Sequence, residues 1–317
     1  ALGQQYEFIN AKVEENIENE NKLNLTFVIS ESQKNYVEKI NIIGNSITRE
    51  NVIRNSLLVD EGDAFNEILH NKSINKIKGS GIFESVNYKI IDGSTVNLKV
   101  IEIEVVEKAT GEISAGGGIG SSGSTIGFGL VENNFMGKGI KVNANMKFAK
   151  NSVRGELSYN NPSFNNSNNS LYTSLSSTKQ DKMTDSGYET SNIGIKVGSN
   201  FEKYEDLYLF PTLEINHEEL KTSSRASANL RKQEGNYFET NLKYILEYDK
   251  RDKFYQPTAG FKSRFIQTIP LIGETYELRN LYEFSLNLLK IKHPSSFWFS
   301  DKILVILSAS SKLLHET

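Results

Sequence analysis

The feature that most constrains the fold is an alternation of apolar and polar residues that recurs from Gly111 to the end of the chain. Residues 153–160 and 238–248 both show this period of two. Successive side chains of a β-strand point to opposite faces, so the pattern predicts strands that are apolar on one face only. The clearest example lies in residues 140–148, where Ile140, Val142, Ala144, Met146 and Phe148 alternate with Lys141, Asn143, Asn145 and Lys147.

The length of the alternating segments favours a membrane barrel. Strands of soluble proteins usually have about 5 to 6 residues, whereas a tilted strand needs about 9 to 11 residues to cross a bilayer. The segments here are closer to the second length. We therefore expect the apolar face to contact lipid and the polar face to line a water-filled lumen. A soluble β-sandwich is the alternative, because it would show the same alternation.

Composition narrows the choice of protein class. The 317 residues contain no cysteine, which excludes disulfides, thiolate metal sites and thiol nucleophiles. No stretch reaches the ~18 apolar residues of a transmembrane helix. The net charge of −3 provides no basic surface for nucleic acid. Residues 1–5 lack the basic and apolar regions of a signal peptide, so we expect any export signal to lie upstream.

The first hundred residues predict a different kind of module. Residues 23–29 and 37–43 have the pattern of strands, and Thr48 is a plausible N-cap for a helix that carries Val52, Ile53, Leu57 and Leu58. A second helix is expected over residues 66–78, with Ile68, Leu69, Ile74 and Ile77. Strands over 86–91 and 96–105 should form a hairpin through Asp92-Gly93-Ser94.

The order β-α-α-β-β predicts a small module with its helices on one face of a sheet. We expect this module to fold alone in water around a shared core of the two helices and three strands. The expected core residues are Val52, Ile53, Leu57, Ile68, Ile77, Phe83, Val86 and Val100.

Several short motifs of this module resemble a known family. Residues 45–48 (Asn-Ser-Ile-Thr), 52–54 (Val-Ile-Arg), 61–65 (Glu-Gly-Asp-Ala-Phe) and 81–86 (Gly-Ile-Phe-Glu-Ser-Val) resemble, in order and spacing, a POTRA domain of the BamA family of outer-membrane protein assembly factors. Each motif alone is common, and the specificity comes from the ordered set.

Motifs in the alternating region are similar to segments from the first half of the BamA-family barrel. They are residues 132–139 (Glu-Asn-Asn-Phe-Met-Gly-Lys-Gly), 161–164 (Asn-Pro-Ser-Phe), and 248–252 (Tyr-Asp-Lys-Arg-Asp) followed by 257–260 (Pro-Thr-Ala-Gly). The resemblance implies three segments. Residues 1–34 would be the end of a preceding POTRA domain, residues 35–108 a POTRA domain, and residues 109–317 the N-terminal part of the β-barrel.

The number of expected strands predicts an incomplete barrel. Bacterial barrels made from one chain close with an even number of strands. Barrels of the BamA family have sixteen, so the chain would carry about eleven of sixteen strands of an antiparallel transmembrane barrel. The eleven expected strands begin near Ile113, Ile126, Ile140, Val153, Leu171, Ile193, Leu207, Phe238, Phe261, Tyr276 and Ile303.

Motifs that could carry enzymatic chemistry have simpler explanations. Residues 118–123 fit the dinucleotide pattern G-x-G-x-x-G, but an alternating strand follows where a helix would be required. The histidines, at positions 70, 217, 293 and 315, are too scattered for a metal site. Asp249, Arg251 and Asp252 fit solvated charges or a lumenal ion pair beside a turn. We expect no enzyme activity, with no catalytic, cofactor-binding or metal-binding residues and no cofactor.

The remaining functional signal is the glycine-rich first strand of the barrel, which should bend easily and pack weakly. In the BamA family the first strand meets the last at a lateral seam, and a client strand is thought to pair with the exposed edge. The residues expected to pair are Ile113, Ser114, Ala115, Gly116, Gly117, Gly118, Ile119 and Gly120. A second pairing edge is expected on the POTRA strand formed by Val86, Asn87, Tyr88, Lys89, Ile90 and Ile91. A structural alternative for the glycines is that they only allow a tight bend of the barrel.

The resemblance implies that the protein folds and inserts β-barrel proteins into the bacterial outer membrane, with its POTRA domains in the periplasm. The implied partners are unfolded outer-membrane proteins, periplasmic chaperones, accessory assembly lipoproteins and outer-membrane lipid, with no nucleic acid. The alternative is a related protein-translocation pore, either an autotransporter assembly factor or a two-partner secretion translocator. A passive porin is more distant, because it would not need the β-α-α-β-β module.

Overall fold

The computed structural model describes residues 9–19, 22–31, 34–120, 123–252, 257–273, 277–287 and 302–312. The chain divides into two units, Ala1–Ala109 and Thr110–Thr317. Some expectations lie outside the described residues. They concern residues 1–8, the strand start at Tyr276, and His293 and His315.

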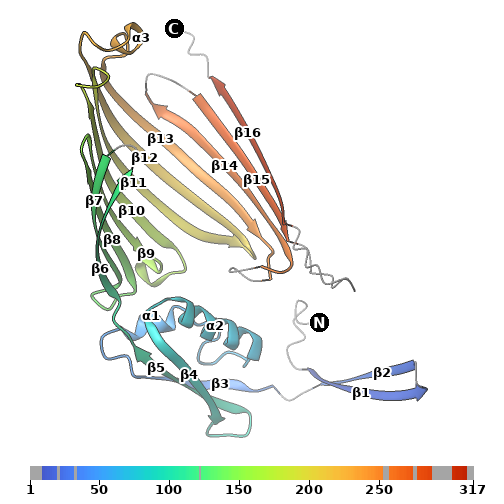
Figure 1. Ribbon diagram of the computed structural model, residues 1–317. Coiled ribbons are helices and arrows are strands. Elements are labelled where there is room, and N and C mark those ends of the chain that lie inside the picture. Colours follow the sequence, from blue (N-terminus) through green and yellow to red (C-terminus); the bar gives the residue numbers. More distant parts are fainter. Residues whose placement is uncertain are drawn as a thin grey trace. The chain divides into compact units, whose positions relative to one another are not determined.

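The first unit begins with an antiparallel hairpin of β1 (Ile9–Asn19) and β2 (Lys22–Glu31) (Figure 1). The strand expected over residues 23–29 lies within β2. The two strands form a sheet of their own among the described residues.

The β-α-α-β-β module follows the hairpin, as the sequence predicts. It consists of β3 (Tyr36–Ile43), α1 (Glu50–Arg54), α2 (Glu67–Gly79), β4 (Phe83–Asp92) and β5 (Leu98–Glu107). The sheet order is β3-β5-β4, with β3 parallel and β4 antiparallel to β5. Both helices lie over one face of the sheet (Figure 1). Strand β4 is therefore at an edge of this sheet.

The core between the helices and the sheet matches most of the predicted residues. Ile53, Ile77, Phe83 and Val86 are buried, and Val52 and Leu57 pack against them. The prediction that Ile68 belongs to the core is wrong, because the residue is 44% exposed. The buried stripe of α2 runs through His70, Ser73, Ile74 and Ile77, and Ile68 lies on the opposite side of the helix. Val100 is only half-buried, because its neighbour Ile101 takes the inward position on β5.

Three local predictions in this module are also wrong. Thr48 is not an N-cap, because α1 begins at Glu50 with Arg49 as its cap, and Thr48 is buried. The helix ends at Arg54, so Leu58 lies beyond it, and its backbone N–H donates to Ser73 Oγ at 2.8 Å. The hairpin between β4 and β5 has a longer turn than expected, since β5 begins only at Leu98 and Val96 is exposed.

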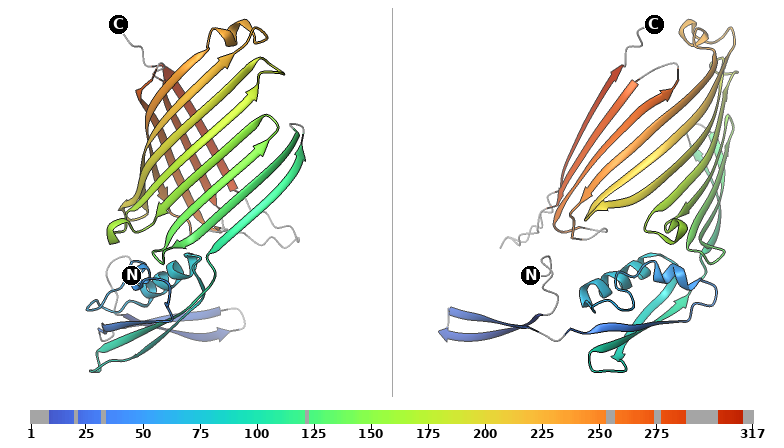
Figure 2. Two further views of the ribbon diagram at one scale, coloured as in Figure 1. Left: turned by 90° about the vertical axis from the view of Figure 1, so that its left-hand side faces the viewer. Right: turned by 180° about the vertical axis from the view of Figure 1, so that it is seen from behind.

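Among the described residues, the second unit is a single sheet of eleven antiparallel strands in sequential order, which confirms the expected strand number. Figure 2 shows that the sheet is one strongly curved layer. A short 3-10 turn, η2 (Phe164–Asn166), and one short helix, α3 (Ala228–Arg231), lie in its connections. The strands are β6 (Gly111–Gly120), β7 (Gly123–Phe135), β8 (Ile140–Ala149), β9 (Ser152–Asn161), β10 (Ser170–Lys182), β11 (Tyr188–Tyr204), β12 (Leu207–Thr222), β13 (Gly235–Asp249), β14 (Gly260–Ile272), β15 (Glu277–Asn287) and β16 (Lys302–Lys312).

The register aligns apolar side chains across neighbouring strands on one face. One row joins Leu130, Ala144, Leu157, Leu175, Ile195 and Ile215, each directly opposite the next. Most of the large side chains in this row are exposed. The row itself contains no polar residue. The opposite face carries polar pairs such as Asn143 with Ser158, joined by a hydrogen bond of 3.3 Å. These are the lipid-facing and lumenal faces of a membrane barrel.

Within the described part of the chain, no helix has both the length and the apolar character needed to span a membrane.

The assignment of faces predicts a labelling pattern on β8. Single cysteines at Lys141, Asn143 and Lys147 should react with a water-soluble maleimide in the membrane-inserted protein, whereas cysteines at Val142, Ala144 and Met146 should be shielded by lipid. The native chain has no cysteine, so the background is zero. Equal labelling of both sets would contradict the membrane orientation and favour a soluble sandwich.

The core of the β-α-α-β-β module predicts a large effect of Phe83→Ala. Phe83 is 6% exposed, and emptying such a site costs about 3 to 5 kcal/mol of the free energy of unfolding. Urea denaturation of residues 35–108 measures this loss. Ile68→Ala is the matched control, because Ile68 is exposed and should change stability by less than about 1 kcal/mol. Equal effects would mean that the core is misplaced.

Candidate functional site: the free sheet edges

Strand β6 has one paired side and one open side. Its residues Gly111–Gly120 pair in register with Glu132–Gly123 of β7, and β6 ends the sheet order among the described strands. All ten residues of β6 are exposed, and Ile113 and Ile119 are 84% and 90% exposed. The predicted pairing residues 113–120 therefore form one continuous strand with a free edge.

The glycines of this strand are not required by packing within the described chain. A Cβ added at Gly116, Gly118 or Gly120 would meet no atom within 4 Å. Gly44 in the first unit is the opposite case, because its φ is +96° and a Cβ would collide with the carbonyl oxygen of Val105. The β6 glycines thus leave the backbone edge bare where side chains would fit. A bare edge lets another backbone approach closely.

The start of β6 is held in place by the end of β7, just before the turn to β8. The backbone N–H and the side-chain Nδ2 of Asn133 both donate to the carbonyl oxygen of Thr110, at 3.1 and 3.3 Å. The next residue, Asn134, is buried and accepts a hydrogen bond from the N–H of Gly139 at 2.8 Å. Met136, Gly137 and Gly139 take positive φ angles in this turn. The motif of residues 132–139 therefore builds a rigid support for one end of β6.

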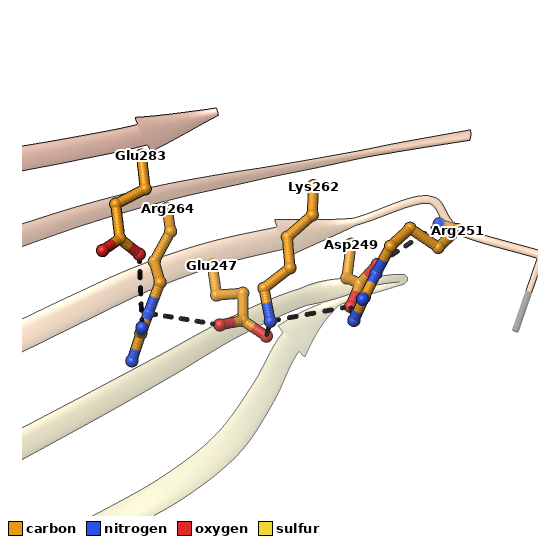
Figure 3. A network of polar contacts seen from close by, with 6 residues as sticks. All are labelled: Glu247, Asp249, Arg251, Lys262, Arg264 and Glu283. Atoms are coloured by element: carbon orange, nitrogen blue, oxygen red, sulfur yellow. Dashed lines mark hydrogen bonds and ion pairs between the residues drawn. The ribbon is translucent and has the colours of Figure 1, made fainter. Parts of the chain in front are cut away.

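A row of ion pairs stiffens the lumenal face of strands β13 to β15 (Figure 3). Glu247 forms ion pairs with Lys262 at 2.7 Å and with Arg264 at 3.5 Å, and Arg264 also pairs with Glu283 at 3.3 Å. Lys262 also lies 3.9 Å from Asp249. Glu247 and Arg264 are directly opposite in the register, as are Arg264 and Glu283. Opposite charges across strands stabilise the pairing, so this wall contrasts with the bare β6–β7 hairpin.

Residues 249–252 lie at the end of this row, where Asp249 and Arg251 form an ion pair. Arg251 binds Asp249 with two hydrogen bonds, from Nε at 2.7 Å and from Nη2 at 2.6 Å. Asp252 accepts hydrogen bonds from the backbone N–H groups of Thr258 and Ala259 at 2.9 and 3.0 Å, and from the Thr258 hydroxyl. The cluster therefore stabilises a turn, which agrees with the ion pair that the sequence led us to expect there.

The second candidate edge is β4 in the first unit. It pairs with β5 along residues 83–92, and its other side is open among the described strands. Tyr88, Ile90 and Ile91 on this strand are exposed. The residues predicted to pair here, 86–91, thus lie at a sheet edge. Their role in pairing stays a prediction.

Sequence reasoning missed Glu107, the last residue of β5. Its carboxylate accepts hydrogen bonds from the N–H and hydroxyl of Ser46 at 3.1 and 2.8 Å, from the N–H of Ile47 at 2.9 Å and from the N–H of Thr48 at 2.6 Å. Burial acts to raise the pKa of Glu107, but these hydrogen bonds outweigh it and lower the pKa to about 2. The hydroxyl residues Ser46 and Thr48 were the available signal, although no pattern pointed to a partner about 60 residues away.

Of the four histidines, the structure describes His70 and His217, which lie in different units. His70 is buried in the first unit, whereas His217 lies exposed on β12. In the part of the chain that the structure describes, no three His, Asp or Glu side chains are grouped as metal ligands would be. Of the dinucleotide-like segment, residues 118–120 end β6 and Gly123 begins β7, so that both described parts belong to strands.

Comparison with known families identifies the architecture. The Omp85 superfamily domain matches residues 134–298, which is more than half of the chain, and the POTRA family, described as a surface antigen variable number repeat, matches residues 35–108. The chain belongs to the Omp85 superfamily. Membership places the barrel in the bacterial outer membrane and the POTRA domain in the periplasm, as the sequence predicts.

The relatives include outer membrane protein assembly factors. BamA of Neorickettsia risticii is 23% identical over 84% of this chain, which covers 36% of that protein. BamA of Neisseria meningitidis serogroup B is 25% identical over 43% of the chain and 17% of that protein. The chain thus spans about a third or less of the length of these curated relatives.

Solved structures show the same fold. The crystal structure of BamA from Haemophilus ducreyi lacking POTRA domains 1–3 matches 98% of this chain with a TM-score of 0.64 and 19% identity, over 62% of that structure. CdiB from Acinetobacter baumannii matches the whole chain with a TM-score of 0.55 and 12% identity, over 59% of that structure.

The hydrogen bonds to Glu107 predict a pH-dependent contribution to stability. A carboxylate whose pKa is lowered in the folded state stabilises the protein above its unfolded pKa of 4.5, and this contribution is lost as the pH falls towards 2. Glu107→Gln should lower the free energy of unfolding of residues 35–108 by about 1 to 2 kcal/mol at pH 7, after allowing for solvent screening. The difference from wild type should shrink between pH 4.5 and 2.

Denaturation at several pH values measures this difference. Glu104→Gln, which removes an exposed carboxylate on the same strand, is the matched control and should have little effect. A pH-independent loss in Glu107→Gln would show that the carboxylate charge is not what stabilises the loop.

Proposed function

We propose that this protein folds and inserts β-barrel proteins into the bacterial outer membrane by pairing a client strand with the free edge of β6. The observation that carries the proposal is the combination found in β6. One side of the strand is open, its glycines leave the backbone accessible, and its start is fixed by Asn133. The names of the BamA relatives support the same activity.

The physical driving force is the satisfaction of backbone groups. A strand edge in lipid exposes N–H and C=O groups that find no water, and each unsatisfied group costs several kcal/mol. A client strand that pairs with β6 satisfies its own groups and those of β6 at once. The reaction is thus a templated addition of strands, the mode known as β-augmentation.

The POTRA domain would hold partners on the periplasmic side. Edge strand β4 offers unpaired backbone groups beside the exposed side chains of Tyr88, Ile90 and Ile91. An extended segment of an unfolded outer-membrane protein could pair there before it reaches the barrel. Periplasmic chaperones and accessory assembly lipoproteins are the further partners that we propose, and outer-membrane lipid surrounds the barrel.

The proposed work needs no covalent step. Strand exchange is driven by backbone hydrogen bonds and by burial of apolar surface in lipid, so we propose a protein that is not an enzyme and uses neither a nucleotide nor a metal ion. The charged groups of the lumenal wall serve structure in this account, because they are paired with one another.

A related protein-translocation pore is the second candidate. Two observations favour it: the fold similarity to CdiB, and the polar lumenal face on strands such as β8 and β9. The two functions use different parts of the barrel. Assembly uses the edge of β6, whereas translocation uses the lumen.

A disulfide that closes the seam separates the two functions. A cysteine at Gly118, crosslinked to the facing position of the strand that closes the barrel in the full-length protein, should block assembly of other barrel proteins, because a client can no longer reach the β6 edge. Client assembly in cells and the crosslinked fraction on gels are the measurements.

The control disulfide joins Gly118→Cys to Thr125→Cys, which face one another between β6 and β7. It constrains the same strand but leaves the outer edge free, so assembly should continue. Normal assembly with the seam fully crosslinked would reject the pairing mechanism. The translocation pore would be favoured if assembly stays normal and blocking the lumen abolishes transport.

A further inference from the structure

His70 is a buried imidazole with an unsatisfied nitrogen. It lies on α2 with its side chain turned into the core, and the residue is 2% exposed. Its Nε2 atom has no hydrogen-bond partner among the described residues. Buried polar atoms are nearly always paired, so this unpaired nitrogen needs a physical explanation.

The surroundings of the ring are aromatic. The ring centroid of Tyr88 on β4 lies 4.5 Å from that of His70 in an edge-to-face arrangement, and the ring of Phe65 lies 6.0 Å away. Tyr88 also donates from its hydroxyl to Asn71 Oδ1 at 3.1 Å. His70 and Asn71 on α2 therefore both contact Tyr88, so that α2 supports the edge strand β4 through this residue.

The charges near His70 do not compensate for a proton on the ring. Burial lowers the pKa of His70 below its usual value of 6.5, and the attraction of Glu67 on the same helix opposes this only in part. The titratable group that faces the ring from β4 is the Tyr88 phenol. Phe65, from the segment before α2, contributes no charge.

We propose that protonation of His70 releases edge strand β4 from α2, so that the POTRA edge responds to the pH of the periplasm. An imidazolium at this position would place a charge against Tyr88 and Phe65 without an acceptor for its second N–H. The conformations in which α2 and Tyr88 separate relieve that cost, because they return the ring to water. Only the consequence of this inference, that client pairing at β4 depends on pH, rests on the proposed function.

The sign of the effect follows from linkage. The opened state binds a proton with an ordinary pKa near 6.5, and the closed state resists it, so the closed state is fully favoured above about pH 6.5 and loses its advantage as the pH falls. The population of the opened state should rise up to about tenfold for each pH unit below 6.5 until the closed state itself titrates.

Hydrogen exchange of the complete 317-residue chain, followed by mass spectrometry at pH 7.5, 6.5 and 5.5, tests this directly. After correction for the intrinsic pH dependence of exchange, peptides that cover β4 and the first half of α2 should lose up to about fivefold of their protection between pH 6.5 and 5.5. Peptides that cover the β13–β14 pair should not change. The readout does not depend on any assembly activity, so it separates failure of this inference from failure of the proposed function.

The matched variant is His70→Phe, which keeps an aromatic ring of similar size but cannot titrate. It should fold and show the same β4 protection at all three pH values. Tyr88→Phe keeps His70 and removes only the hydroxyl bond to Asn71, so it should retain the pH dependence. A wild-type profile without pH dependence, or an equal pH dependence in His70→Phe, would overturn the proposal.

Discussion

The structure depends on one constraint, which is that every backbone N–H and C=O group of a strand in lipid needs a partner. All ten neighbouring strand pairs of the described sheet are consecutive and antiparallel, and the backbone groups inside the sheet are satisfied by this ladder. At β6 the ladder has an open side. The backbone groups there define a position where a further strand is strongly stabilised, and this constraint links the fold to the proposed activity.

The sheet is also uneven in stiffness along its width. Strands β13 to β15 are joined by large side chains and by the ion pairs of Glu247, Arg264 and Glu283. The β6–β7 hairpin has glycine on both strands, with Gly116 directly opposite Gly127, so few side chains resist its bending. The sheet thus combines a rigid wall at β13 to β15 with a pliant edge at β6, whereas β16 forms its other end among the described strands.

The sequence predicted the strand number and the module order, because period-two alternation and the turn residues act locally. It failed where a contact between distant residues decides the structure. Thr48 resembles an N-cap by type and spacing, but its backbone is bound by Glu107, which lies 59 residues away. Ile68 fits a helical apolar pattern, yet the polar residue His70 takes the buried stripe of α2.

The candidate site was predictable in position but not in detail. The glycine cluster at residues 116–120 pointed to β6, whereas the support of Thr110 by Asn133 depends on a turn with positive φ angles that no periodicity describes. The lumenal ion pairs were suggested for Asp249 and Arg251 alone. Their continuation to Glu283 depends on the register of three strands, which the sequence does not fix.

Site-specific photocrosslinking from the β6 edge tests the central claim most directly. A photoreactive amino acid at Ala115, on the lipid-facing side of β6, should crosslink to the terminal strand of a client that is arrested during assembly in cells. The same group at Leu157, on the lipid-facing side of the interior strand β9, should not crosslink to the client. Assembly of the client with no crosslink at Ala115, or with equal crosslinks at both positions, would contradict strand pairing at β6.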